Sequence, residues 1–311
     1  MTDTLPTSPS RYTPSDFFLS RRRWLSRGMS VLLFLAAALS VVVTTSIVYI
    51  LVSESWSFFA TIPLWTFLTD TQWTPVFAEP RYGILPLLTA TLWSAGIALV
   101  IAIPLGTILA VYLSEYARPA VRETIKPMLE LLVAVPTVVY GYFALLFLTP
   151  LFKQFVPGLA GFNLLVPGIV LGIMTLPYIV SISEDAMRAV PGALREGAYA
   201  LGMTRFQTAM RVIIPGAFSG ITAAYVLGMS RAVGETMILA IAAGQNPNLT
   251  SDPREGAATI TAYIVQMSMG DLPHGSLAYQ TIFAAGLTLF VMTLVFNIIG
   301  FFLRRRFREV Y

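Results

Sequence analysis

The sequence predicts an all-α membrane protein with six transmembrane helices, because of its composition and the spacing of its charges. Of its 311 residues, 56% are hydrophobic and only 12% are charged, whereas soluble chains average about 25% charged residues. Long apolar runs separate the charges, and each exceeds the ~20 residues with which a helix crosses a bilayer. Five runs carry no charge: Gly28–Ser53, Tyr82–Ser114, Leu131–Phe152, Gln154–Ser183 and Gly275–Leu303. A sixth run, Val212–Gly244, carries only Arg231 and Glu235.

The first run follows a basic segment that has two interpretations. The chain begins rich in Ser, Thr and Pro, which predicts a disordered tail over residues 1–28, and four arginines lie within Arg21–Arg27. A cleaved secretory signal is one interpretation, since Ala36–Ala38 resembles a cleavage site. The apolar run continues to Val52, beyond the roughly 7–15 residues of a signal core, so we expect a retained helix.

The basic residues predict the orientation of the chain. If both termini are cytoplasmic, the inside segments carry 16 of the 20 Lys and Arg residues, and the outside segments carry only Arg81, Lys153 and Arg254. This asymmetry follows the positive-inside rule. The basic inside segments also account for the sequence pI of about 9.4, so nucleic-acid binding is not needed to explain it. The inside segments are residues 1–28, 114–127, 183–215 and 303–311, the last of which includes a cytoplasmic tail, 304–311.

Prolines and aromatic residues suggest local features of the helices and outside segments. Pro136 lies inside the third run and predicts a kink, and Pro136 and Thr137 are candidates either for packing or for lining a substrate path. In the fourth run, Pro167, Gly172 and Pro177 predict a broken or flexible helix. Outside the membrane, we interpret Trp56, Trp65 and Trp73 as interfacial anchors, with a docking surface as the alternative, and Ala257–Met269 as an apolar patch along the membrane surface.

The residue types present argue against an enzyme. There is no cysteine, and a single histidine, His274, makes neither a metal site nor a catalytic triad by itself. Neither lysine, Lys126 or Lys153, follows a glycine, so the chain has no Walker A loop for nucleotide phosphates. We therefore expect no catalytic residues, no metal site and no bound cofactor.

Arg231 and Glu235 are the candidate substrate-path residues. A charge at the bilayer centre costs at least about 2.5–3.5 kcal/mol, which marks both as functional candidates. Their i, i+4 spacing places them on one helix face, where they could form a purely structural ion pair. The alternative is an anion path, because a guanidinium offers a planar fork of donors to phosphate or carboxylate oxygens.

The polar segment Arg195–Pro215 is predicted to be an ordered docking element on the cytoplasmic side. It resembles the cytoplasmic loop of bacterial ABC-importer permeases, which reads Glu-Ala-Ala, three residues, Gly, nine residues and Ile-x-Leu-Pro. Glu196, Ala198, Gly202 and Pro215 match this signature, whereas Gly197, Val212 and Ile214 depart from it. The resemblance implies the type I ABC importer permease fold and a coupling helix that seats on an ATPase subunit.

A closer resemblance covers most of the chain from the second helix onward. The segments PLGTILAVYLSEYA, AVPTVVYGYFALLF, SRAVGETMILAIAAG and YQTIFAAGLTLFVMTLVFN are similar to PstC-type subunits of phosphate importers, in which the equivalents of Arg231 and Glu235 are associated with the phosphate path. The resemblance implies a permease domain over 29–303, with a coupling loop at about 184–215, in the bacterial inner membrane.

The same resemblance implies the partners. They are a PstA-type permease forming a heterodimer, an ATPase homodimer that uses ATP and Mg, and an external phosphate-binding protein. The remaining alternatives are a permease for another oxyanion such as sulfate or molybdate, the PstA-type partner itself and, more distantly, a self-contained channel or secondary carrier.

Overall fold

The computed structural model describes the main chain of residues 16–306, in which the regular structure is helical apart from an isolated β-bridge between Trp73 and Tyr82. The chain divides into two compact units, residues 1–52 and 53–311, which are described separately.

The first unit consists, in its described part, of helix α1, which begins at Asp16 and continues to Thr61 in the second unit. Residues 16–28 are therefore helical and not part of a disordered tail as the sequence predicted. Arginine has a good helix propensity, and extending a helix already formed by the following apolar run costs little. The predictions for residues 1–15 lie outside the described part of the chain.

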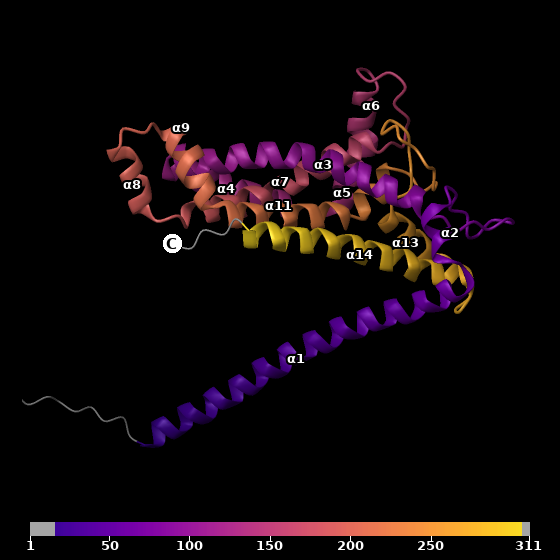
Figure 1. Cartoon of the computed structure of the whole chain (residues 1–311), viewed down its shortest axis with the longest axis horizontal. Coiled ribbons are helices and arrows are strands. Elements are labelled where there is room, and N and C mark those ends of the chain that lie inside the picture. Colours follow the sequence, from indigo (N-terminus) through magenta and orange to yellow (C-terminus); the bar gives the residue numbers. More distant parts are fainter. Residues whose placement is uncertain (1–15, 307–311) are drawn as a thin grey trace, which may run out of the picture. The chain divides into compact units, whose positions relative to one another are not determined.

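The second unit is a bundle in which α3, α7, α11 and α14 lie side by side (Figure 1). Helices α8 and α9 lie at one end of the bundle, and α2, α6 and α13 lie at the other (Figure 1). The elements after α1, in chain order, are α2 (Leu64–Thr69), α3 (Leu85–Val111), the π-helical turn η1 (Tyr112–Tyr116), α4 (Pro119–Ala134), α5 (Thr137–Phe143), η2 (Ala144–Leu148), α6 (Thr149–Phe152), α7 (Leu165–Arg188), α8 (Gly192–Ala200), α9 (Arg205–Thr208), η3 (Ala209–Ile213), α10 (Ile214–Gly216), α11 (Phe218–Val233), α12 (Met237–Ala242), α13 (Ile260–Ser268) and α14 (Leu277–Arg306).

The membrane spans agree with the prediction of six, although two of them are broken. Among the described residues, four helices are long and apolar enough to cross a membrane: Leu25–Thr61, Leu85–Tyr116, Leu165–Arg188 and Leu277–Arg305. Two further spans count only if each bent pair of helices is one span. These pairs are Pro119–Ala134 with Thr137–Phe152, bent by 86°, and Arg205–Gly216 with Phe218–Val233, bent by 73°.

The 86° bend lies at Pro136, where the sequence predicted only a kink. Val135 and Pro136 are both extended, with ψ angles of 127° and 135°, so the helix ends completely between α4 and α5. Proline lacks an N–H and disfavours helical geometry at the preceding residue, and both effects favour a break here. The Tyr140 hydroxyl donates to the Leu132 carbonyl at 2.8 Å and so bridges the two arms.

Helix α7, in contrast, is continuous, so of the predicted broken or flexible fourth span the broken alternative was wrong. Pro167 lies in its first turn, where proline forfeits no helical hydrogen bond. Gly172 serves close packing against α3, because a Cβ placed on it would lie 2.9 Å from the Ala98 carbonyl oxygen. The pair α3 and α7 forms the centre of the bundle.

The outside end contains an aromatic core instead of a simple anchor belt. Trp73 is fully buried and makes edge contacts with Phe67 and Tyr263, at ring-centroid distances of 6.1 and 5.2 Å. The interpretation as an interfacial anchor is therefore wrong for Trp73. Trp56 and Trp65 are exposed, and for them it stays a prediction. The apolar patch Ala257–Met269 was predicted to lie on the membrane surface, but α13 buries its first turn against this core.

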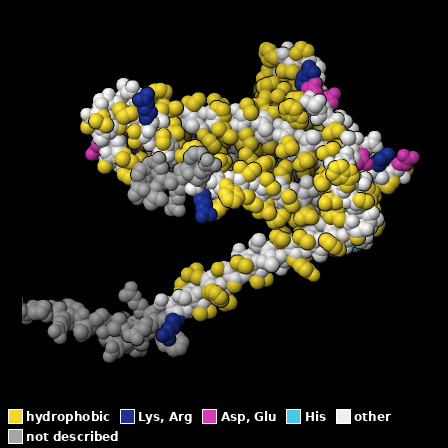
Figure 2. Space-filling model, in the orientation of Figure 1, with side chains coloured by type: hydrophobic (Ala, Val, Ile, Leu, Met, Phe, Trp, Pro, Cys, Tyr) yellow, Lys and Arg dark blue, Asp and Glu magenta, His cyan; other side chains and the backbone are white. Residues whose placement is uncertain are grey.

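The surface of the second unit has the charge distribution of a membrane protein. Figure 2 shows hydrophobic side chains over the flank of the bundle, with Lys, Arg, Asp and Glu gathered toward its two ends. A lipid-facing belt between two charged ends is the arrangement that hydrocarbon requires.

We predict that Gly172→Ala lowers the melting temperature of the purified permease by several degrees, because the added methyl overpacks the α3–α7 contact at a cost of about 1–3 kcal/mol. The matched control is Gly96→Ala on α3, where a Cβ meets nothing within 4 Å. Thermal unfolding in detergent compares the two variants, and equal melting temperatures would contradict this account of the α3–α7 packing.

Candidate functional site

Arg231 and Glu235 lie where the apolar run Val212–Gly244 is interrupted between α11 and α12. Arg231 occupies the last turn of α11, and Glu235 lies in the non-helical segment that separates α11 from α12. Their side chains approach to 3.8 Å between Arg231 Nη2 and Glu235 Oε2. The predicted pairing is therefore present, but at the end of a helix and not on one continuous helix face.

Glu235 is buried and hydrogen-bonded in this interruption. Its side chain is 3% exposed, and Oε1 accepts a hydrogen bond from the backbone N–H of Ile238 at 3.4 Å, at the start of α12. Its own carbonyl accepts from the Thr261 hydroxyl on α13 at 2.7 Å. Both the side chain and the backbone of the break thus find partners inside the protein, as a non-helical segment at membrane depth requires.

Arg231, in contrast, keeps most of its donors uncommitted. Its side chain is 37% exposed, its distance to Glu235 exceeds that of a hydrogen bond, and its buried Nε has no partner among the described residues. The guanidinium carbon lies 5.7 Å from the centre of the Tyr178 ring on α7, within the range of a cation–π contact. A cation oriented by a ring, with free N–H groups, can bind an oxyanion.

Pro136 and Thr137 lie at the start of α5, which packs against α12. The contact is close, because a Cβ on Gly141 would lie 3.2 Å from the Met237 carbonyl oxygen. No hydrogen bond or ion pair within the described chain joins Pro136 or Thr137 to Arg231 or Glu235. The structure thus places α5 beside α12, the helix that follows Glu235, without placing these two residues on the arginine.

The predicted docking loop forms two short helices around a glycine turn. Helix α8 ends before Gly202, whose φ of +79° is the left-handed conformation that favours glycine, and Thr204 forms a capping box with Gln207 at the start of α9. Pro215 lies in α10, just before the 73° bend into α11.

The exposed face of this loop mixes one acid with apolar side chains. Glu196 and Gly202 are exposed, and Leu201 is 85% exposed next to the exposed ring of Tyr199. Ala198, which the sequence also assigned to docking, is buried and faces the protein instead. An exposed leucine and tyrosine at the charged end of a membrane protein form a surface suited to a protein partner.

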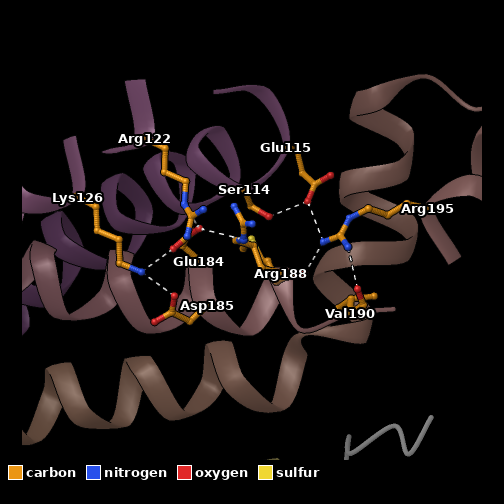
Figure 3. Close-up of polar contacts among 10 residues, drawn as sticks. Ser114, Glu115, Arg122, Lys126, Glu184, Asp185, Arg188, Val190 and Arg195 are labelled. Atoms are coloured by element: carbon orange, nitrogen blue, oxygen red, sulfur yellow. Dashed lines mark hydrogen bonds and ion pairs between the residues drawn. The ribbon is translucent and has the colours of Figure 1, made fainter. Parts of the chain in front are cut away.

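A buried ion-pair cluster at the same end of the bundle was missed by the sequence interpretation (Figure 3). Glu184, on the last turns of α7, is 1% exposed in its side chain and lies 2.8 Å from Arg122 and 3.0 Å from Lys126, both on α4. The Arg122 contact is an ion pair by distance but is not aligned as a hydrogen bond. Lys126 also binds the neighbouring Asp185 at 2.7 Å, so two acids of α7 hold α4 in place.

A second part of this cluster joins the docking loop to the helices. Arg195 of α8 lies 3.3 Å from Glu115 in η1 and donates to carbonyl oxygens at the end of α7 (Figure 3). The only sequence signal for these contacts was the position of the acids and bases at the inner border of the predicted spans. Sequence positions alone did not show which of them meet.

The family follows from comparison with known proteins. Residues 102–309 match the model of the family described as "Binding-protein-dependent transport system inner membrane component". The chain belongs to this family of ABC-transporter permeases. It is thus an inner-membrane, multi-pass transport subunit, and members of the family work with an ATPase and a substrate-binding protein.

Individual relatives cover most of the chain. It is 40% identical over 240 residues to "Probable ABC transporter permease protein YqgH" of Bacillus subtilis, covering 77% of each chain. It is 34% identical to "Phosphate transport system permease protein PstC" of Haemophilus influenzae, covering 73% of this chain and 77% of the relative. The PstC protein of Mesorhizobium japonicum is 33% identical and 83% of each chain is covered.

Solved structures show the same fold at low sequence identity. A bacterial ABC transporter involved in alginate import matches with a TM-score of 0.63 at 16% identity, covering 93% of this chain and 100% of that chain. The inward-facing MetNI methionine transporter matches with a TM-score of 0.53 at 19% identity, covering 73% of this chain and 95% of that chain. The type I ABC importer permease fold is thereby confirmed.

We predict that Glu184→Gln destabilises the permease, because it leaves cations of α4 without their buried acid. The cost lies at the lower end of the about 3–5 kcal/mol for breaking a buried pair, since the cations are partly solvated. The matched control is Asp185→Asn, whose carboxylate is 60% exposed and contributes about 1 kcal/mol or less. Thermal unfolding of both variants in detergent is the measurement, and an equal or larger loss for Asp185→Asn would refute the buried role of Glu184.

Proposed function

We propose that this chain is the PstC-type membrane subunit of an ATP-driven phosphate importer. The observation that carries the proposal is the environment of the Arg231 guanidinium. It lies over the Tyr178 ring and 3.8 Å from the Glu235 carboxylate, and its buried Nε has no hydrogen-bond partner among the described residues. Relatives named as phosphate permeases at 33–34% identity support phosphate as the substrate.

Arg231 and Glu235 have different roles in binding the anion. The guanidinium fork offers two parallel N–H groups to two phosphate oxygens, which a lysine could not match in geometry. Glu235 balances the charge of Arg231 while the path is empty, which lowers the cost of keeping a cation in the membrane. With hydrogen phosphate present, the carboxylate accepts a hydrogen bond from the protonated oxygen. An arginine shared in this way guides the anion and releases it readily.

The energy for transport comes from a partner. The chain has no Gly-Lys sequence to hold nucleotide phosphates, so an ATPase homodimer supplies ATP and Mg chemistry through the surface of α8 and Gly202. A PstA-type subunit completes the membrane path as a heterodimer, and a phosphate-binding protein delivers the anion from outside. ATP binding closes the ATPase pair and opens the path outward, and the reset opens it inward.

Arg231→Gln is predicted to reduce ATP-dependent phosphate uptake by about tenfold or more. The amide loses the charge-assisted hydrogen bonds to the anion, each contributing about 1.5–3 kcal/mol. Uptake of radiolabelled phosphate by cells that express the complete transporter measures the effect. The control is Arg81→Gln, which removes a cation at the outside end, 3.3 Å from Asp70, and leaves uptake unchanged. Phosphate uptake that survives Arg231→Gln would rule out the path role.

Gly202→Asp is predicted to separate the permease from its ATPase. A φ of +79° strains any side chain, and the new carboxylate adds charge to the exposed docking surface. The matched control is Gly197→Ala, an exposed position of α8 where a Cβ meets nothing within 4 Å. Co-purification of the ATPase subunit with tagged permease is the measurement. If no ATPase accompanies the unaltered permease, or if Gly202→Asp leaves both association and uptake intact, the importer proposal fails.

A further inference from the structure

Arg195 lies on the docking helix but contacts the membrane helices. Glu196 and Tyr199 of α8 are exposed, whereas the Arg195 side chain on the same helix is only 21% exposed. Figure 3 shows the guanidinium directed toward the end of α7 and toward Glu115. Arg195 is thus the charged side chain of α8 that connects this helix to the bundle.

Three acceptors from two separate elements share this guanidinium. Nη1 donates to the Val190 carbonyl at 2.7 Å, and Nη2 donates to the Met187 carbonyl at 2.6 Å and to Glu115 Oε1 at 3.3 Å. Glu115 is almost fully buried in η1, and its Oε1 also accepts from the Ser114 hydroxyl at 2.7 Å. One residue of α8 is therefore bonded both to the end of α7 and to the continuation of α3.

The bonds to α7 have a clear physical reason. The last carbonyls of a helix have no partner within the helix, and a cation there also interacts favourably with the helix dipole. Helix α7 ends at Arg188, so Met187 lies in its last turn and Val190 just beyond it, and the Met187 carbonyl also accepts from the Val190 N–H at 3.4 Å. Arg195 caps α7 from the next helix, across the turn at Pro191. The cap cannot be kept if α8 moves independently of α7.

The other contacts of α8 with the bundle, among the described residues, include apolar ones. Leu194 packs against the apolar cluster around Met187 and Ile213, and Ala198 is buried. These apolar contacts are non-directional and allow α8 to slide, whereas a forked guanidinium with three acceptors fixes both distance and orientation. The resistance of the α8–α7 junction to displacement therefore depends strongly on Arg195.

The helix that Arg195 caps is also the helix that contacts the proposed path. Tyr178, whose ring lies under the Arg231 guanidinium, is nine residues before Met187 on α7. At 1.5 Å per residue this is about 13–14 Å along one continuous helix. Between them, Glu184 joins the same helix to α4. A displacement of the α7 end thus reaches both the contact with Arg231 and the α4–α5 arm.

We propose that Arg195 is a positioning residue that couples the docking helix α8 to α7 and α3, so that movement of the ATPase subunit reaches the substrate path. This inference rests on the proposed function, in which the ATPase binds at α8. Loss of Arg195 should leave the exposed docking face intact, because its side chain points away from that face. The transporter would then bind its ATPase and hydrolyse ATP, but move less phosphate for each ATP.

The test uses the complete transporter reconstituted in liposomes with the loaded phosphate-binding protein outside. Arg195→Gln removes the forked cation, and Arg195→Lys keeps the charge but cannot reach three acceptors at once. Arg118→Gln removes an exposed arginine just before α4, outside the docking loop, as a control. Three quantities are measured: ATPase co-purification, the ATP hydrolysis rate and the phosphate transported per ATP.

We expect Arg195→Gln to retain the ATPase subunit and ATP hydrolysis while phosphate per ATP falls by about tenfold, with Arg195→Lys between it and the unaltered protein. Arg118→Gln should match the unaltered protein. A ratio for Arg195→Gln within about twofold of the unaltered protein would overturn the inference. So would loss of the ATPase subunit in a normally folded variant, since Arg195 would then belong to the docking face.

A second variant decides the question if Arg195→Gln does not fold. Glu115→Gln weakens only the arm to η1 and leaves the two carbonyl bonds in place, so it should assemble and lower phosphate per ATP by about two- to fivefold. An unchanged ratio for Glu115→Gln would then contradict the inference. Failure of the proposed function looks different: the unaltered permease itself would lack an associated ATPase or ATP-driven phosphate uptake.

Discussion

Hydrocarbon offers no hydrogen-bond partners, so a chain that breaks its helices or carries charge in a membrane must satisfy those groups from within. The two interrupted regions of this bundle meet that requirement in different ways. The break after α4 is bridged by the Tyr140 hydroxyl, and the break after α11 is held by the Glu235 side chain and by Thr261. Arg231 is the exception, because its buried Nε finds no partner within the described residues. The protein thus satisfies the rest of this region and leaves the arginine available.

The cytoplasmic end follows the same principle with charges. Glu184 is buried, yet two cations of α4 contact it, and Arg195 donates to the Met187 and Val190 carbonyls at the end of α7. Both arrangements converge on α7, the most buried of the candidate spans. This helix therefore connects the docking loop, the α4 arm and the Tyr178 contact with Arg231. The structural neighbours share the fold at 16–19% identity, whereas the substrate depends on such local side chains.

Much of the fold could be predicted from the sequence, because long charge-free runs and asymmetric loop charges have direct physical meaning in a bilayer. The helix breaks were harder to predict. Pro136 ended a helix and Pro177 did not, since the outcome depends on whether neighbouring helices can hold the freed backbone groups. Trp73 is likewise indistinguishable from an anchor until Phe67 and Tyr263 are known to surround it.

The candidate site shows the same limit. Arg231 and Glu235 could be found because charges inside an apolar run are rare, and Gly202 could be found by its place in a known loop signature. Glu184 and Arg195 could not, because acids and bases are ordinary at an inner membrane border, and their ionic partners Lys126 and Glu115 are 58 and 80 residues away in sequence. Only the folded arrangement shows which groups Glu184 and Arg195 contact.

Substrate-resolved transport tests the central claim most directly. The chain, assembled with its partner permease, ATPase and phosphate-binding protein in liposomes, is supplied with labelled phosphate or labelled sulfate in the presence or absence of ATP. Our account predicts accumulation of phosphate that requires both ATP and the binding protein, with sulfate excluded. Phosphate entry without ATP, or ATP-driven uptake of sulfate in place of phosphate, would contradict it.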